Sequence, residues 1–130
     1  MTGKCARAMQ MLSGYMETTL ETAEAQDWQS EIQFDLTGED PFYISIAKTR
    51  VELHAGRTDN PDVVLSGRSD IFFDILIGRL DPDEAYVMKK YAVSGSVVEA
   101  MKFRRICELT EQAHKSTFSA LKTFGKFAFK

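Results

Sequence analysis

The residues best suited to chemistry are two histidines, two cysteines and a group of carboxylates. Such side chains perform acid–base, nucleophilic or metal chemistry only when several of them stand together at a workable spacing. His54 and His114 are isolated, with no Ser, Cys or carboxylate placed beside either at a recognisable spacing. Cys5 and Cys107 lie far apart, have no second pair to complete a zinc motif, and are predicted to be free thiols. The sequence therefore predicts no enzyme activity, no metal and no cofactor.

The acidic group at Asp81, Asp83 and Glu84 is explained by the start of a helix. Asp81 can cap the free N–H groups, Pro82 stands where its missing N–H costs nothing, and Glu84 can reach back to the cap. General acid catalysis would instead need a carboxyl held in an apolar pocket. Asp74 is the one candidate for that role, and its helical position predicts that it faces water.

The stretch that these residues surround, RSDIFFDILIGRL at 68–80, is predicted to be a helix with almost no polar side. At 100° per residue it carries two adjoining apolar stripes. They consist of Ile71, Phe72, Ile75, Leu76 and Leu80 in one, and Phe73, Ile77 and Leu80 in the other. A helix packed on a sheet needs a stripe of only about 100°. This helix therefore requires a second apolar neighbour, either another helix or a bound lipid.

The segments around this helix follow the order strand, helix, short helix, strand, helix. DVVLSG at 62–67 has the short apolar character of a buried strand and stops at Gly67. A short helix begins at Pro82, and Tyr91 to Val93 form a brief strand. Ser96 and Glu99 then make a capping box for a helix that continues beyond residue 101.

Residues 62–103 resemble the sterol carrier protein type 2 family, the nonspecific lipid-transfer domains. In that family a helix ends in Gly-x-(Leu/Met)-(Asp/Asn)-Pro, and a basic strand, a Gly turn and an Ala-Met-Lys helix follow. The matching residues are Gly78, Leu80, Asp81, Pro82, Ala85, Tyr86, Lys90, Val93, Gly95, Ala100, Met101 and Lys102. The chain departs from the family pattern at Lys89, where a Gly is common, and at Val98, where a small residue is common.

The resemblance implies an α+β fold: a five-stranded, mostly antiparallel sheet with helices packed on one face and an apolar tunnel between them. It also implies noncatalytic binding or transfer of a sterol, a fatty acid or a fatty acyl-CoA. Helical-wheel positions nominate the lipid-binding wall as Phe73, Leu76, Ile77, Leu80, Tyr86, Met88 and Met101. Candidates for headgroup or membrane contact are Lys89, Lys90, Lys102, Arg104 and Arg105.

Upstream of the matching segment the chain predicts an amphipathic helix and a hairpin. An amphipathic helix at about 4–28 carries one apolar face, formed by Cys5, Met9, Leu12, Met16 and Leu20. Its methionines are interpreted either as core or as a pliable wall against a lipid. Period-2 alternation predicts strands at 31–37 and 42–47. A two-residue connection at Lys48-Thr49 would pair Ile46 with Val51 in an antiparallel hairpin.

Charge is divided unevenly along the chain. Residues 8–47 hold eight acids and no Lys or Arg, whereas residues 89–130 hold nine basic residues and three acids. The helix after residue 103 should turn Arg104 and Arg105 outward and Cys107 inward. The tail at 116–130 is basic and rich in Phe, lacks acids, and predicts a helix followed by either more helix or a strand. A net charge of −3 argues against nucleic-acid binding, while the basic half suits transient contact with anionic headgroups.

The 130 residues predict a single domain, with no transmembrane helix and no signal peptide, and hence a cytoplasmic location. Two other hypotheses stand beside the carrier. In the first, the domain is a protein-interaction or accessory module, as similar domains are in quinone-lipid metabolism, and the Phe-rich tail or the N-terminal helix covers a partner or forms a homodimer. In the other, it is a small enzyme that acts on a hydrophobic substrate.

Overall fold

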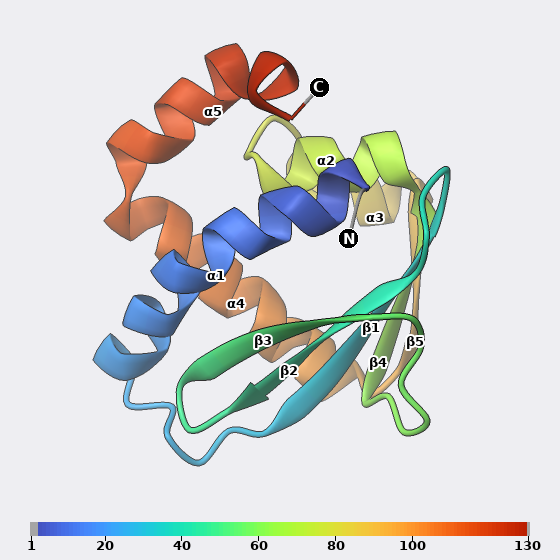
Figure 1. The fold of residues 1–130 in the computed structure, drawn as a ribbon, viewed down its shortest axis with the longest axis vertical. Helices are drawn as coiled ribbons and strands as arrows, with labels where there is room; N and C mark the ends of the chain where they lie inside the picture. Colours follow the sequence, from blue (N-terminus) through green and yellow to red (C-terminus); the bar gives the residue numbers. More distant parts are fainter. Residues whose placement is uncertain (1–2, 130) are drawn as a thin grey trace.

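Five helices and five strands form the part of the chain that the structure describes, residues 3–129 of a computed structural model (Figure 1). In chain order they are α1 Lys4–Thr22, β1 Ser30–Thr37, β2 Phe42–Ala47, β3 Arg50–Ala55, β4 Val63–Arg68, α2 Ser69–Leu76, α3 Pro82–Val87, β5 Tyr91–Gly95, α4 Val97–Ala113 and α5 Lys115–Ala128. None of these helices is both long and apolar enough to cross a bilayer.

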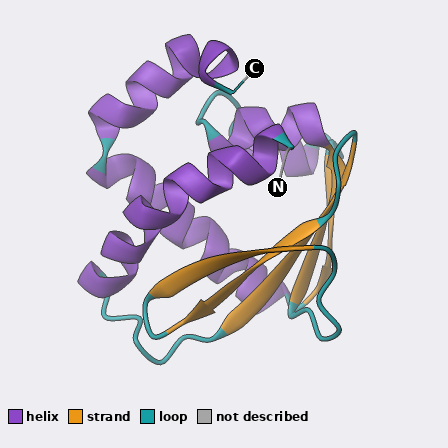
Figure 2. Ribbon diagram, viewed as in Figure 1, coloured by secondary structure: helices purple, strands orange, loops and turns teal. Residues whose placement is uncertain are grey.

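The strands form one sheet in the order β3-β2-β1-β4-β5. β1 and β4 run parallel, while every other neighbouring pair is antiparallel. The helices lie on one face of this sheet (Figure 2). Alternate residues such as Ile32, Phe34, Ile44 and Ile46 are buried, which is the expected result of period-2 alternation. The predicted α+β class, with five strands and a mostly antiparallel sheet, is confirmed.

The hairpin between β2 and β3 has the predicted register, with Ile46 opposite Val51. Its two connecting residues, Lys48 and Thr49, both have positive φ, at 52° and 64°. Residues other than glycine rarely adopt this conformation, so something must hold the turn in place. Glu17 on α1 does so, because its carboxylate accepts a hydrogen bond of 2.8 Å from the backbone N–H of Val51.

Helix α1 buries the predicted apolar face, formed by Cys5, Met9, Leu12, Met16 and Leu20. The predicted end near Trp28 is wrong, because α1 stops at Thr22 and Glu24 takes a left-handed φ of 55°. Its start lacks a side-chain cap of its own. Instead Glu39, from the turn between β1 and β2, accepts hydrogen bonds from the backbone N–H groups of Cys5 and Ala6.

The apolar helix after Arg68 is shorter than the sequence predicted. α2 ends at Leu76, and Gly78 follows with a φ of 83°, a conformation that favours glycine. The carbonyl of Asp74 then accepts hydrogen bonds from the N–H groups of both Arg79 and Leu80. Leu80 therefore lies in the turn before α3 rather than on the stripe predicted for a longer helix.

Both predicted caps in this region are present. Asp81 accepts a hydrogen bond of 2.8 Å from the N–H of Asp83, and Ser96 accepts one of 3.2 Å from the N–H of Glu99. In a capping box the Glu99 carboxylate would also accept a hydrogen bond from the backbone N–H of Ser96. Here it instead accepts one of 2.6 Å from the indole of Trp28. This bond ties the loop after α1 to the start of α4.

As far as residue 129, the basic tail forms helix α5 and no strand. Phe118 and Leu121 are buried, as their helical spacing predicted. At the far end the ring of Phe129 lies 5.7 Å from that of Phe73 on α2, measured between centroids. The C-terminal end of α5 therefore lies beside α2 (Figure 1). Lys130, the last residue of the predicted tail, lies outside the described residues.

A pair of glycine substitutions tests how β5 leads into α4. Gly95 has a φ of 94°, and a Cβ there would stand 2.5 Å from the carbonyl oxygen of Asp62. We expect Gly95→Ala to lower the free energy of unfolding in urea by about 1–3 kcal/mol or more, because backbone atoms must move. Gly14→Ala is the control, since its Cβ would meet nothing within 4 Å on helix α1, and it should raise stability by about 0.5–1 kcal/mol. Equal effects of the two substitutions would contradict this account.

Candidate functional site

A cavity of about 720 Å³ lies between the sheet and the helices. Its walls come from β1, β4 and β5 on one side and from α1, α2, α3, α4 and α5 on the other. The apolar part of the wall consists of Met9, Leu12, Met16, Phe34, Leu65, Phe72, Ile75, Leu76, Leu80, Pro82, Tyr86, Tyr91, Val93, Val97, Ala100, Met101, Phe103, Cys107 and Phe118. Cavities of roughly 300–1,000 Å³ with mainly apolar walls are typical of sites for small molecules.

The cavity reaches the surface between α3 and α4. Tyr86, Val97 and Met101 line it and are nevertheless 53%, 65% and 64% exposed. A side chain that borders both the cavity and the solvent marks an opening, which we call the mouth. Whether a second opening makes the cavity a tunnel, as the family resemblance implies, stays a prediction.

The structure brings four of the seven predicted wall residues to the cavity. They are Leu76, Leu80, Tyr86 and Met101. Three others lie elsewhere: Phe73 and Ile77 are buried outside the cavity lining, and Met88 is exposed. Placement in the wall does not test lipid binding, which stays a prediction for all seven.

Phe73 and Ile77 miss the cavity because the chain itself covers their side of α2. The ring of Phe73 contacts that of Phe129, and the ammonium group of Lys4 lies 4.9 Å from the Phe73 ring centroid. Ile77 lies against Gly125 of α5, where an added Cβ would stand 3.1 Å from the Ile77 side chain. One apolar stripe of α2 therefore faces the cavity, and the other packs against α1 and α5.

Most wall residues on α1, β1 and α4 were not among the predicted ones, and Met101 is the one predicted wall residue on α4. Met9 and Met16 were considered as a pliable wall, and the structure places both in the lining. On α4 the spacing of the residues in the sequence could have identified the wall. The lining residues Val97, Ala100, Met101, Arg104, Cys107, Glu108 and Glu111 recur at spacings of three and four, which define one helical face. Arg104 is exposed, as predicted, and it also borders the cavity at the mouth.

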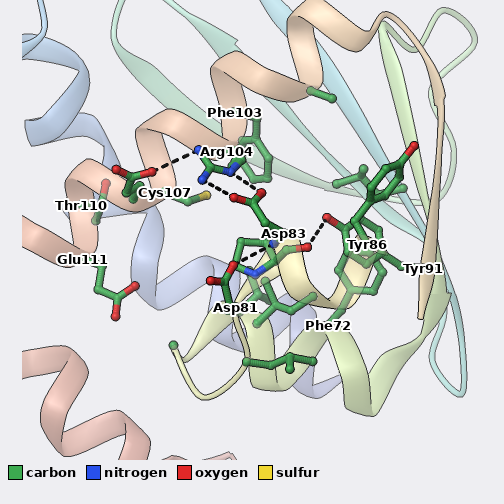
Figure 3. A pocket seen from close by; sticks show the side chains of 18 of the residues that line it. Phe72, Asp81, Asp83, Tyr86, Tyr91, Phe103, Arg104, Cys107, Thr110 and Glu111 are labelled. Atoms are coloured by element: carbon green, nitrogen blue, oxygen red, sulfur yellow. Dashed lines mark hydrogen bonds and ion pairs between the residues drawn. The ribbon is translucent and has the colours of Figure 1, made fainter. Parts of the chain in front are cut away.

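Arg104 joins α4 to α3 at the mouth (Figure 3). Its Nε donates a hydrogen bond of 2.6 Å to one carboxylate oxygen of Asp83, and its Nη2 donates one to the other oxygen. Its Nη1 donates a hydrogen bond of 3.1 Å to Glu108. The hydrogen bond from Arg104 lowers the pKa of Asp83, and the same bond raises the pKa of Arg104. The pair with Asp83 is bidentate, which fixes the geometry of both side chains at the mouth.

The other predicted headgroup candidates stand outside the cavity lining. Lys89, Lys90 and Lys102 are exposed and form no ion pair with a described carboxylate. Arg105 is also exposed and pairs with Glu108 at 2.6 Å. The cations of this region thus flank the mouth, while Arg104 alone among them lines the cavity.

Both cysteines are free thiols, as predicted. Cys107 lines the cavity, and removal from water raises its pKa to about 12, with a smaller contribution from Glu111. Burial also raises the pKa of Cys5, whose thiol donates to the carbonyl of Ser69 at 3.1 Å. A thiol is nucleophilic only as the thiolate, so neither group is activated at neutral pH.

The residues that could support catalysis are not gathered in the cavity. Ser45 and His54 lie 3.1 Å apart on the strands β2 and β3, and Glu52 approaches the same ring nitrogen at 3.8 Å rather than the opposite one. A triad needs the carboxylate on the other nitrogen, so this arrangement lacks the required geometry. Neither His54 nor Asp74 lines the cavity. Within residues 3–129 no three His, Cys, Asp or Glu side chains are grouped as metal ligands.

The fold and the cavity define a class of small α+β domains that enclose an apolar space between a sheet and its helices. The sequence profile of the SCP-2 sterol transfer family matches residues 10–108. The chain belongs to the SCP-2 sterol transfer family, which confirms the resemblance noted in the sequence. No curated protein matches the chain at a significant level.

Solved structures share the fold at low sequence identity. The solution structure of the sterol carrier protein domain 2 of Helicoverpa armigera has a TM-score of 0.65 and 19% identity, covering 84% of this chain and 89% of that one. Palmitated SCP2L2 from Aedes aegypti has a TM-score of 0.63 and 14% identity over 82% and 95%. The UbiJ-SCP2 ubiquinone synthesis protein has a TM-score of 0.64 and 12% identity over 78% and 86%.

The ion pair at the mouth predicts that the pKa of Asp83 depends on Arg104. Because Arg104 stabilises the ionised form, the pKa of Asp83 lies below its usual value and the pair is lost only as the pH falls through that lowered pKa. We expect Arg104→Gln to return the pKa of Asp83 to its usual range of about 4, measured by NMR titration of the side-chain carboxyl. Arg105→Gln is the matched control, because Arg105 pairs with Glu108 alone. An Asp83 pKa that is the same in all three proteins would refute the assignment.

Proposed function

We propose that this domain binds an apolar ligand of lipid size in the cavity and carries it without chemical change. The observation that supports this proposal is the cavity itself, about 720 Å³ with a mainly apolar wall and an open mouth. Family membership favours the same function, and the Aedes aegypti relative with this fold is described as palmitated. The ligand classes that the family resemblance implies are sterols, fatty acids and fatty acyl-CoA.

Burial of hydrocarbon supplies enough free energy for this function. Each buried CH₂ group contributes about 0.8 kcal/mol, and micromolar affinity needs about 8 kcal/mol. A chain of roughly sixteen carbons exceeds this requirement before the entropy of immobilisation is subtracted. The methionines Met9 and Met16 suit a wall that must accommodate ligands of different shape. Affinity of this kind depends on apolar area, which favours a broad range of ligands.

Filling the cavity should abolish binding. Ala100 lines the cavity on α4, and Ala100→Phe would place a ring in the space that the ligand needs. We expect ligand binding to fall at least about tenfold, measured by displacement of a fluorescent lipid and by native mass spectrometry of co-purified lipid. Ala113→Phe, at an exposed position of the same helix, should bind like the wild type. Unchanged binding by a folded Ala100→Phe protein would refute the cavity as the site.

The surface around the mouth is suited to contact with a membrane. We define the docking surface as the exposed apolar residues of α3, α4 and the turn after α3: Tyr86, Val87, Met88, Val97, Val98 and Met101. Lys89, Lys90 and Lys102 stand beside it without ion-pair partners among described carboxylates. Apolar side chains flanked by lysines match the acyl and anionic headgroup layers of a bilayer. A ligand could then pass between membrane and mouth without crossing water.

Two exposed valines test this contact without touching the cavity. Val87 and Val98 belong to the docking surface, and neither lines the cavity. We expect Val87→Glu with Val98→Glu to reduce cosedimentation with vesicles of phosphatidylcholine and phosphatidylglycerol by about tenfold or more, while binding of a soluble fluorescent ligand persists. Phe124→Glu serves as control, because Phe124 on α5 is about as exposed as Val98 and lies outside the docking surface. Loss of vesicle binding in the control alone would place the contact on α5 instead.

A second candidate function is an accessory module for another enzyme. The similarity of fold to the UbiJ-SCP2 ubiquinone synthesis protein favours it. In that case the docking surface would receive a partner protein or a second copy of this chain, and the cavity would present a ligand to it. Transfer of a fluorescent lipid between vesicles distinguishes the two functions. A carrier accelerates transfer, whereas a module retains its ligand until its partner is present.

A further inference from the structure

The charged side chains that line the cavity are mostly acidic. Asp81, Asp83, Glu108 and Glu111 are carboxylates, and Arg104 is the one basic residue among the described lining residues. Asp81 and Asp83 stand at the start of α3 beside Arg104 (Figure 3), and Glu108 joins them through its hydrogen bond to Arg104. Glu111 lies farther along α4, where it pairs with Lys122. A ligand that buries its hydrocarbon in the cavity would therefore leave its polar end beside Asp81, Asp83 and Glu108 and one guanidinium.

Arg104 is already committed to carboxylates of the chain. All three of its guanidinium nitrogens donate hydrogen bonds, two of them to Asp83 and one to Glu108. These bonds use three of the five N–H groups of a guanidinium, so a ligand carboxylate or phosphate could still reach the other two. It would then stand next to the carboxylates of Asp83 and Glu108, whose repulsion offsets the attraction of Arg104.

The other nearby cations do not make the net charge of the mouth positive. Arg105 pairs with Glu108 at 2.6 Å and Lys122 pairs with Glu111 at 3.1 Å, so each of these cations offsets the charge of one acid and leaves no excess positive charge. Lys89, Lys90 and Lys102 lie outside the lining and face solvent. Because like charges repel more strongly beside an apolar wall than in bulk water, an anionic ligand loses affinity at this position. A neutral hydroxyl instead finds several carboxylate oxygens that can accept its hydrogen bond.

We propose that the cavity selects apolar ligands whose polar end is uncharged, such as a sterol or a long-chain alcohol, over fatty acids and acyl-CoA. This inference rests on the proposed function, since it concerns the ligand of the same cavity. It narrows the ligand classes by charge, with Asp83 and Glu108 as the specificity-determining residues. Asp83 acts by occupying Arg104, and Glu108 acts both through Arg104 and through its own charge.

A pair of ligands with the same chain length tests the proposal. Hexadecanol and hexadecanoate are compared as competitors of the neutral dye Nile red, at pH 8 and below the critical micelle concentration of the acid. We expect hexadecanol to bind at least about tenfold more tightly, with the difference shrinking at high salt. Equal or tighter binding of hexadecanoate would overturn the charge selectivity and leave the carrier function intact. Failure of both ligands and of the dye to bind would overturn the carrier function, and this inference with it.

Variants that remove the acids should reduce the preference for the uncharged ligand. Asp83→Asn combined with Glu108→Gln frees Arg104 and removes two negative charges from the mouth. We expect the affinity for hexadecanoate to rise about tenfold, while that for hexadecanol changes less than about twofold. Glu52→Gln is the control, because Glu52 is exposed on β3 outside the cavity lining. No gain for hexadecanoate in the double variant, or an equal gain in the control, would contradict the role assigned to the two acids.

Discussion

Burial of the apolar circumference of α2 is the constraint on which the rest of the structure depends. α2 has apolar residues on more than one side, and exposure of any of these side chains to water is unfavourable. Phe72 and Leu76 face the cavity, whereas Phe73 is covered by α1 and α5. The chain therefore supplies one of the two apolar neighbours that α2 requires. The cavity occupies the place of the other, which explains why the space adjoins this helix.

The position of α5 follows from the same constraint. Its Phe118 borders the cavity, its Gly125 allows close approach to Ile77, and Phe129 packs on Phe73. A residue with a side chain at position 125 would press on Ile77, since even a Cβ would stand 3.1 Å away. The Phe-rich tail thus substitutes for a lipid on one side of α2 and leaves the other side of the helix unfilled. It is a wall of the cavity rather than a plug.

Local patterns predicted the elements well, because period and capping are properties of short segments. The hairpin register, the buried face of α1, and the caps at Asp81 and Ser96 could all be predicted from the sequence. The two errors at helix ends arose because periodicity shows the apolar face of a helix but not where the helix stops. Local backbone hydrogen bonds close both ends, with a positive φ at Glu24 after α1 and at Gly78 after α2. The cavity wall was predicted only in part, since a helical wheel shows which residues are apolar but not which neighbour covers them. The ion pair of Arg104 was not predicted for a related reason, because its partner Asp83 lies 21 positions away in the sequence.

An empty, closed cavity of this size would not survive in a small domain. Empty apolar volume destabilises a protein by about 24 cal/mol per Å³, which for about 720 Å³ exceeds 10 kcal/mol and rivals the whole stability of a typical domain. The walls do not collapse to remove it, because Phe34 is stacked on Phe42 at 4.7 Å and meets Phe72 and Phe103 edge-on. An open mouth lets water enter such a cavity, although an apolar wall offers water few hydrogen bonds. The apolar ligand that we propose would displace that water and stabilise the fold, and ligand binding would then be linked to folding stability.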